Sequence, residues 1–381
     1  MTRRMTRREL LKYALLGLGA LAFRLPGARH PGDLAAPKRL PPFPNAPRLG
    51  RVTQPDIALR STPNNSSGEA NVIARLPADT LVVWEREVVG TVVGGPNYQR
   101  YVETPDGYIF GGMIQPVANQ PQTPIQQIPP GKNGFWAEVS VPYVDLAHEG
   151  ALASPWLRDH IEYNFPPRLY YGQVVWMDQV RTSNGFVEYR WNEGAEGRGY
   201  GYGGYGEFYW ADGAGFRVLT DADVAPISPE IDPAEKTIQV NLGWQVLSCF
   251  EGAREVYHCR VSTGRQETDP ATGEVVDYTT PAGKLLTHWK IISKNMTAGD
   301  EASGYSTPAV PWCTYIQGGA AIHGTFWHSA FGEPRSHGCV NVAIEDAKWI
   351  FRWTTPYVSL DAGEERRSLP DYGTVVYSTY P

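Results

Sequence analysis

Turn-forming residues divide this chain into short segments, and their spacing limits what it can fold into. Its 381 residues include 40 glycines and 32 prolines. Between them run short, largely apolar stretches, such as 57–60, 72–76 and 80–84. Short runs of this kind, bounded by turn residues, are typical of strands, and Gly and Pro favour the turns that join them. The 21 tyrosines and 12 tryptophans also suit strands. The sequence therefore predicts a mainly β protein.

Length and charge narrow the possibilities further. At about 100–200 residues per domain, the chain has room for two or three domains. Charged residues make up 19% of it, which is typical of a globular protein. The net charge of −6 argues against nucleic acid as a partner, because such an interface needs a basic face. Four cysteines are too few for a disulfide scaffold.

The N-terminus has the pattern of an export signal. Arg7 and Arg8 precede a short apolar run from Tyr13 to Phe23. A basic segment followed by about 7–15 apolar residues is typical of a secretory signal, and the paired arginines resemble the twin-arginine type. We expect residues 1–28 to be a signal peptide or an uncleaved anchor and the only part that meets the membrane. The other interpretation is a basic, disordered start that leads into a buried helix.

Two β-rich blocks are predicted next. Residues 29–48 are rich in Pro, Ala and Arg, which indicates a linker. Residues 49–118 contain Leu-Arg-Ser-Thr-Pro-Asn near their start and Gly-Tyr-Ile-Phe-Gly-Gly near their end, a layout that resembles bacterial SH3-like domains. Binding to the cell wall is common in that family.

The block at 134–229 repeats this pattern weakly. Its segment 186–191 corresponds to Tyr98–Val102, and 211–219 corresponds to Pro105–Met113. We expect a second, diverged SH3-like domain. A Gly/Tyr loop at 194–206 interrupts it, either as a flexible insertion or as an aromatic surface that stacks on sugar rings.

The last block, 234–380, has a different pattern. Residues 237–242 alternate as a strand, and 245–250 and 255–261 flank a turn and predict a hairpin. Residues 344–353 carry apolar side chains at helical spacing, which predicts a short helix covering a sheet.

Two short motifs in this block carry the chemistry. The first is Ile322-His323-Gly324-Thr325, and the second is Ser336-His337-Gly338-Cys339-Val340-Asn341; we refer to residues 326–335, between them, as the spacer. A thiol becomes a useful nucleophile as its thiolate, and a neighbouring imidazole can generate that form. Gly338 allows a tight turn whose backbone N–H groups could stabilise an oxyanion.

These motifs resemble the active-site signature of the L,D-transpeptidase (YkuD-type) family, and the resemblance extends over roughly the last 145 residues. Val261-Ser262-Thr263-Gly264 and Thr280-Pro281-Ala282-Gly283 are similar to further landmarks of the family. The resemblance implies a β-rich domain with its thiol in a cleft. The twin-arginine-like signal predicts export to the periplasm or to the cell-wall side of the membrane.

The resemblance implies a reaction and a role for each residue. Cys339 would attack the carbonyl before the terminal D-alanine of a peptidoglycan stem peptide, and the amine of a neighbouring stem would resolve the thioester into a 3-3 crosslink. His323 would be the general base. His337, Gly338 and Cys339 would supply oxyanion contacts, and Ser336 would orient the turn. The substrate cleft would be lined by Gly324, Thr325, Trp327, His328, Arg335 and Asn341. No cofactor or metal is expected.

Several alternatives remain open at this stage. Water as acceptor would make the enzyme an L,D-carboxypeptidase, a hydrolase. His328 competes with His323 as the base, and a solvated surface role for Arg335 is as reasonable as a substrate contact. A non-catalytic wall-binding protein, in which the SH3-like blocks contact glycan strands, is a third. Cell-wall cysteine peptidases are disfavoured, because their cysteine precedes the histidine. Cys249 and Cys259 fall in neighbouring strands, where we favour two buried thiols over a disulfide.

Overall fold

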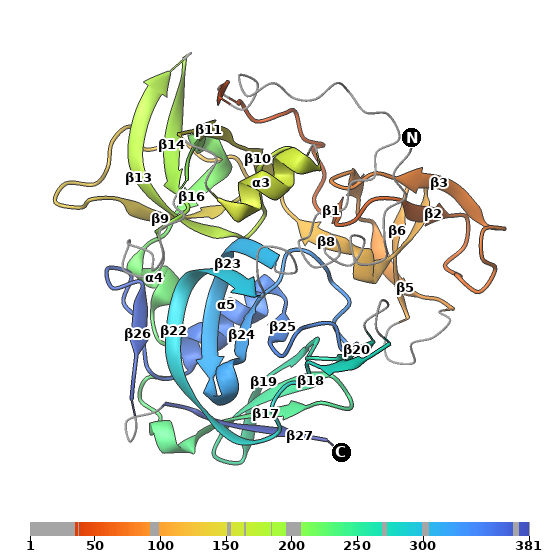
Figure 1. Cartoon of the computed structure of the whole chain (residues 1–381), viewed down its shortest axis with the longest axis vertical. Helices are drawn as coiled ribbons and strands as arrows, with labels where there is room; N and C mark the ends of the chain where they lie inside the picture. Colours follow the sequence, from red (N-terminus) through yellow and green to blue (C-terminus); the bar gives the residue numbers. More distant parts are fainter. Residues whose placement is uncertain are drawn as a thin grey trace.

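The computed structural model describes ten stretches of the chain: residues 35–36, 38–91, 99–150, 154–163, 165–183, 185–195, 207–268, 273–298, 305–368 and 373–380. The predicted export signal and most of the Gly/Tyr loop lie outside these residues. None of the helices within them has the length and apolar character needed to span a bilayer. The prediction of a mainly β protein is confirmed, and Figure 1 shows three groups of strands with few helices.

The first block forms two small sheets. Three strands pair in the order β4-β1-β8, and five pair in the order β3-β2-β7-β6-β5. A single turn of 3-10 helix, η1 (Gly111–Met113), joins the two sheets at β7 and β8. The strands are β1 (Leu49–Val52), β2 (Ile57–Arg60), β3 (Val72–Leu76), β4 (Leu81–Val83), β5 (Arg86–Val89), β6 (Arg100–Thr104), β7 (Gly107–Phe110) and β8 (Ile114–Val117).

The second block is built around one six-stranded sheet. Its order is β11-β15-β14-β13-β9-β16, and β10 and β12 pair beside it. Its helical segments are α3 (Pro155–Glu162), η2 (Gly213–Gly215) and α4 (Asp221–Val224). Its strands are β9 (Phe135–Val139), β10 (Tyr143–Asp145), β11 (Ala147–Glu149), β12 (Arg168–Tyr170), β13 (Val174–Ser183), β14 (Phe186–Asn192), β15 (Phe208–Asp212) and β16 (Phe216–Val218).

The two blocks share a strand order. If β4 and β5 are joined end to end, the first block follows β2-β7-β6-β5/β4-β1-β8, which corresponds strand by strand to β11-β15-β14-β13-β9-β16. In both blocks a 3-10 turn precedes the last strand. The weak repeat in the sequence therefore has a counterpart in topology. Neither block closes into a barrel within the described residues, so the SH3-like assignment stays a prediction.

The C-terminal block contains a nine-stranded sheet. Eight strands pair in the order β19-β18-β17-β27-β22-β23-β24-β25, and β26 pairs with β22. The predicted hairpin and the predicted helix are both present. The elements are η3 (Pro233–Glu235), β17 (Lys236–Asn241), β18 (Val246–Glu251), β19 (Arg254–Arg260), β20 (Gln266–Thr268), β21 (Val275–Asp277), β22 (Gly283–Ala298), β23 (Tyr305–Ile316), η4 (Gln317–Gly319), β24 (Ala321–Gly324), β25 (Val340–Val342), α5 (Ile344–Trp353), β26 (Glu364–Arg366) and β27 (Val375–Thr379).

Helix α5 covers the sheet beside β23 and β24 (Figure 1). Its apolar face buries Ala347, Ile350 and Phe351, as the helical spacing predicts. Glu345 and Asp346 lie in its first turn and Arg352 in its last, which suits the helix dipole. The helix thus packs against β24, the strand that carries the first motif.

The second and third blocks are packed into one another. Trp136 and Val174 of the second block belong to the main apolar core of the C-terminal block. Buried hydrogen bonds join the same surfaces, since the Gln173 side chain donates to Pro308 O and Ser293 Oγ donates to Val174 O. The C-terminal block therefore does not present this face to solvent.

Candidate active site

The two motifs meet because β24 and β25 pair in parallel. Ile322 lies opposite Val340, and His323 opposite Asn341. Side chains alternate between the faces of a sheet, so residues two apart on one strand share a face with their partners on the next. Cys339, directly before β25, therefore lies on the same face as His323. Both side chains line one small pocket together with Met296, Thr307, Trp327, Arg335, Ser336, His337 and Asn341.

Cys339 is a free, half-buried thiol. Burial raises its pKa above the usual value, and a backbone contact with Ala321 offsets part of this effect. Desolvation disfavours the charged form of a thiol. At neutral pH the resting side chain is therefore the thiol, and a base must remove its proton during attack.

His323 can act as such a base. It is buried, and its Nδ1 lies 3.1 Å from Gly324 O. Because a carbonyl oxygen can only accept, Nδ1 carries the proton and Nε2 keeps its lone pair. Burial lowers the pKa of His323 to about 4, while the Gly324 contact partly opposes the shift. The imidazole is therefore neutral at pH 7.

His328 has a different environment. Its Nδ1 accepts a hydrogen bond from Ala330 N at 3.3 Å, and its Nε2 lies 3.0 Å from the Asn341 side-chain amide. Asn341 Nδ2 is the amide atom that faces this nitrogen. Both His328 nitrogens are thus engaged, which favours His323 as the base.

The turn that carries the nucleophile, residues 336–339, is fixed by hydrogen bonds. Ser336 Oγ accepts from Gly338 N at 3.1 Å and donates to Cys339 O. Gly338 has φ of +115°, a conformation that favours glycine. The orienting role expected for Ser336 matches this geometry. The Gly338 N–H, in contrast, is already bonded within the turn.

The two landmark segments outside the motifs, 261–264 and 280–283, pack against the backbone of this turn. Thr280 Oγ1 donates to Gly338 O at 2.9 Å and accepts from Gly264 N at 2.9 Å. A Cβ at position 264 would lie 1.9 Å from Tyr278 O and 2.9 Å from Gly338 Cα. Three backbone segments therefore meet where only glycine fits.

His337 and Arg335 lie at the exposed side of the pocket. The His337 ring packs edge-on against Tyr278 at 4.4 Å, and its Nε2 is 3.7 Å from Glu267. Burial lowers the pKa of His337, and Glu267 opposes this. Arg335 is 3.4 Å from Glu333. Neither contact involves the thiol, so both residues are better suited to substrate than to proton transfer.

The remaining predicted residues occupy different surfaces. Trp327 lines the Cys339 pocket, and its ring centroid is 5.8 Å from that of His323. Thr325 lines a separate cavity of about 330 Å³ between the first and third blocks. At Gly324, a Cβ would lie 3.0–3.2 Å from Pro311 and Ile344, so this residue serves close packing. Met296 and Thr307 were not predicted, because no motif marks the β22–β23 hairpin that carries them.

Residues 235–377 match the family model described as the L,D-transpeptidase catalytic domain (YkuD). The C-terminal block is a YkuD-type catalytic domain. Its match covers both motifs and the two landmarks that hold the nucleophile turn. A search of curated proteins found no match.

Solved structures of L,D-transpeptidases are also similar to this chain. The protein from Xylanimonas cellulosilytica is 23% identical over 38% of this chain and 61% of its own, with a TM-score of 0.25. A mutant of the Enterococcus faecium enzyme is 21% identical over 40% and 51%, with a TM-score of 0.28. The Mycobacterium smegmatis protein is 14% identical over 53% and 98%, with a TM-score of 0.29. The chain spans about three fifths of the first and half of the second, and the family model carries the assignment.

Proposed function

We propose that this protein is an L,D-transpeptidase that acts on peptidoglycan stem peptides and forms 3-3 crosslinks. The observation that carries the proposal is the pairing of β24 with β25, which brings His323 and Cys339 to one pocket within a YkuD-type catalytic domain. The substrate is a tetrapeptide stem, cleaved between its diamino acid and the terminal D-alanine.

The first half-reaction makes a thioester. As Cys339 Sγ attacks the scissile carbonyl, its proton passes to His323 Nε2. The tetrahedral intermediate then collapses, the C–N bond breaks, and the proton on His323 goes to the departing D-alanine amine. In the second half-reaction the side-chain amine of a neighbouring stem attacks the thioester, and the resulting amide is the crosslink. Cys339 recovers its proton.

In the resting site the Cys339 thiol and the His323 imidazole are both neutral, and this determines when the proton is transferred. The pKa of Cys339 is raised and that of His323 is lowered, in both cases chiefly by burial. The site therefore does not begin as a thiolate–imidazolium pair. Proton removal accompanies attack, as in general base catalysis.

The developing oxyanion needs donors in the nucleophile turn. Gly338 N–H is bonded to Ser336 Oγ, so we assign this role to the backbone N–H groups of His337 and Cys339. Preorganised donors of this kind are worth about 2.7–4 kcal/mol each in transition-state stabilisation. Arg335 lies in the pocket wall, and we assign it the pairing with a substrate carboxylate.

The test is acylation by a carbapenem, followed by intact-protein mass spectrometry. The wild-type protein should gain one adduct, and Cys339→Ala should gain none. His323→Ala should react more slowly by about 10²–10⁴-fold, whereas His328→Ala, if folded, should react close to the wild-type rate. Absence of an adduct on folded wild-type protein would overturn the mechanism and favour a wall-binding protein.

Product analysis then separates transfer from hydrolysis. With purified disaccharide-tetrapeptides, a crosslinked dimer indicates the transpeptidase and a disaccharide-tripeptide alone indicates the carboxypeptidase. The dimer has the mass of two disaccharide-tetrapeptides less one D-alanine, and the tripeptide product has the mass of one unit plus water less one D-alanine, so their masses distinguish them.

The N-terminal parts of the chain have proposed roles of their own. We propose that residues 1–28 direct export to the periplasm or the wall side of the membrane. We also propose that the blocks at 49–118 and 134–229 are SH3-like modules that bind glycan strands, and their shared strand order supports a common origin. Sedimentation of the Cys339→Ala protein with purified cell-wall sacculi tests the binding, and a protein that stays in the supernatant contradicts it.

A further inference from the structure

The spacer is held partly from outside the catalytic domain. Its C-terminal part is bonded within the domain, because Ser262 Oγ donates to Ala330 O and Gly332 N donates to Val261 O. Its first half also binds the first β block, where Phe326 O accepts from Arg51 Nη2 at 2.6 Å and Ser329 N donates to Gly112 O at 3.0 Å. The segment that carries Trp327 is thus fixed between two blocks.

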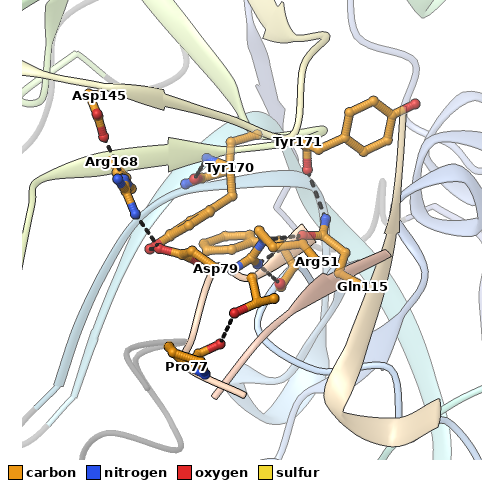
Figure 2. Close-up of polar contacts among 11 residues, drawn as sticks. Arg51, Pro77, Asp79, Gln115, Asp145, Arg168, Tyr170 and Tyr171 are labelled. Atoms are coloured by element: carbon orange, nitrogen blue, oxygen red, sulfur yellow. Dashed lines mark hydrogen bonds and ion pairs between the residues drawn. The ribbon is translucent and has the colours of Figure 1, made fainter. Parts of the chain in front are cut away.

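Arg51 has no access to solvent, and every part of its side chain is in contact with a neighbour. Its guanidinium lies 3.9 Å above the Tyr170 ring, and Gln115 Oε1 accepts from its Nε at 3.1 Å and its Nη2 at 2.8 Å (Figure 2). Nη1 forms an ion pair with Asp79 at 2.8 Å. A planar guanidinium bonded on all sides has one orientation, so Nη2 points at Phe326 O.

Asp79 balances the charge of Arg51 and links it to a second ion pair in the second block. Asp79 also pairs with Arg168 at 2.8 Å, and Arg168 in turn binds Asp145 (Figure 2). Two cations and two anions therefore share the interface. Buried ion pairs contribute little net stability but define a single arrangement when every member is satisfied.

The bond to Phe326 acts on the catalytic pocket through Trp327. The carbonyl of residue 326 belongs to the peptide bond that leads into Trp327, so fixing that peptide plane fixes where the Trp327 backbone starts. The Phe326 ring is stacked on Tyr170 at 5.8 Å and meets the Trp327 ring edge-on at 4.9 Å. Trp327 then contacts His323 and forms a wall of the Cys339 pocket.

We propose that Arg51 is a positioning residue for the catalytic site. It holds the spacer through Phe326 O, so that Trp327 forms the pocket wall beside His323 and Cys339. The first β block thereby completes the substrate cleft of a domain to which it does not belong. This inference rests on the proposed function for its kinetic consequence, but the positioning itself can be observed without catalysis.

The experiment uses the full chain and compares Arg51→Met with Arg168→Met. Both changes remove one cation from the network and leave Asp79 with one cationic partner, but only Arg51 contacts the spacer. For each variant, the acylation rate with a carbapenem is divided by the alkylation rate of Cys339 with iodoacetamide, a small reagent that does not need the pocket wall. All rates are measured below the melting temperature, so that loss of folded protein does not enter the ratio.

We expect the ratio to fall by about ten- to hundredfold in Arg51→Met, because small misplacements in a site have effects of this size. It should stay close to wild type in Arg168→Met, and Arg51→Lys, which keeps a donor toward Phe326 O, should be intermediate. An unchanged ratio in folded Arg51→Met, or an equal fall in Arg168→Met, would overturn the positioning role while leaving the enzyme's function intact. If Arg51→Met does not fold, Arg51→Lys and Gln115→Met give the same test.

Hydrogen exchange separates this result from failure of the proposed function. If the wild-type protein is not acylated, the proposed function is wrong. The exchange rate of the peptide that covers the spacer still measures whether the contact with Arg51 fixes this segment. Faster exchange there in Arg51→Met than in Arg168→Met supports the positioning role. Equal exchange in the two variants overturns it.

Discussion

The two segments that line the Cys339 pocket are held in different ways. The nucleophile turn, residues 336–339, depends on contacts inside the catalytic domain, through Gly264 and Thr280. The spacer depends in part on the first β block, through Arg51 and Gly112. The difference suggests that the chemistry belongs to the catalytic domain alone, whereas the shape of the cleft depends on the whole chain. Changes on the two sides should therefore have different effects.

The largest effect is expected at Gly264. In Gly264→Ala the new methyl group would lie 1.9 Å from Tyr278 O, so backbone must move, at a cost of more than about 4 kcal/mol. Carbapenem acylation should be lost and the melting temperature should fall sharply in calorimetry. Gly252→Ala is the control, since its Cβ meets open space and its φ of +61° alone costs about 1–2 kcal/mol. Equal effects of the two changes would contradict the crowding.

A smaller loss is expected for Thr280→Val. The methyl group keeps the shape but removes the hydroxyl that joins Gly264 N to Gly338 O. Leaving these groups without a partner should cost about 3 kcal/mol in the free energy of unfolding and slow acylation. Thr268→Val, on exposed strand β20, should change neither quantity. A wild-type acylation rate in Thr280→Val would show that the nucleophile turn keeps its conformation without the Thr280 hydroxyl.

On the spacer side, Gly112→Ala should have a milder effect. Its Cβ would lie 2.9 Å from Ala330 Cβ, and such overpacking costs about 1 kcal/mol. Acylation should slow, while alkylation by iodoacetamide should not. The double change Gly112→Ala with Ala330→Gly should restore both stability and rate, since it returns the missing space. If the double variant is not rescued, crowding between residues 112 and 330 is not the cause of the slower acylation.

The smallest expected effect is that of pH. His323 must be unprotonated to act as base, and its lowered pKa of about 4 keeps it so well below neutrality. The acylation rate should therefore show no loss on acidification from pH 7 to 5, and should fall only as the pH approaches 4. An exposed histidine would instead cause a loss near its ordinary pKa of about 6.5. Stopped-flow rates across this range decide between the two.

The sequence predicted the nucleophile side better than the spacer side, for a physical reason. The nucleophile turn is held by residues that fall in short sequence motifs, and such motifs can be found in the sequence alone. These residues are Gly264, Thr280, Ser336 and Gly338. The hairpin at β18–β19, helix α5 and the buried, free thiols of Cys249 and Cys259 also followed from local pattern. Arg51 is 275 positions from Phe326, and no period or motif links residues that meet only when separate blocks pack. Tyr278, Glu267 and Met296 lie within the catalytic domain but outside any motif, so they escaped prediction as well.

The parallel pairing of β24 and β25 has a consequence for the length of the segment that joins them. Two antiparallel strands can be joined by two residues, but a parallel pair needs a connection of about a dozen or more, which must leave the sheet and return to the same end. The fifteen residues between His323 and Cys339 are therefore close to the shortest length that this topology allows. In this chain the connection that the sheet requires is also the segment to which the first β block is attached, through Arg51 and Gly112.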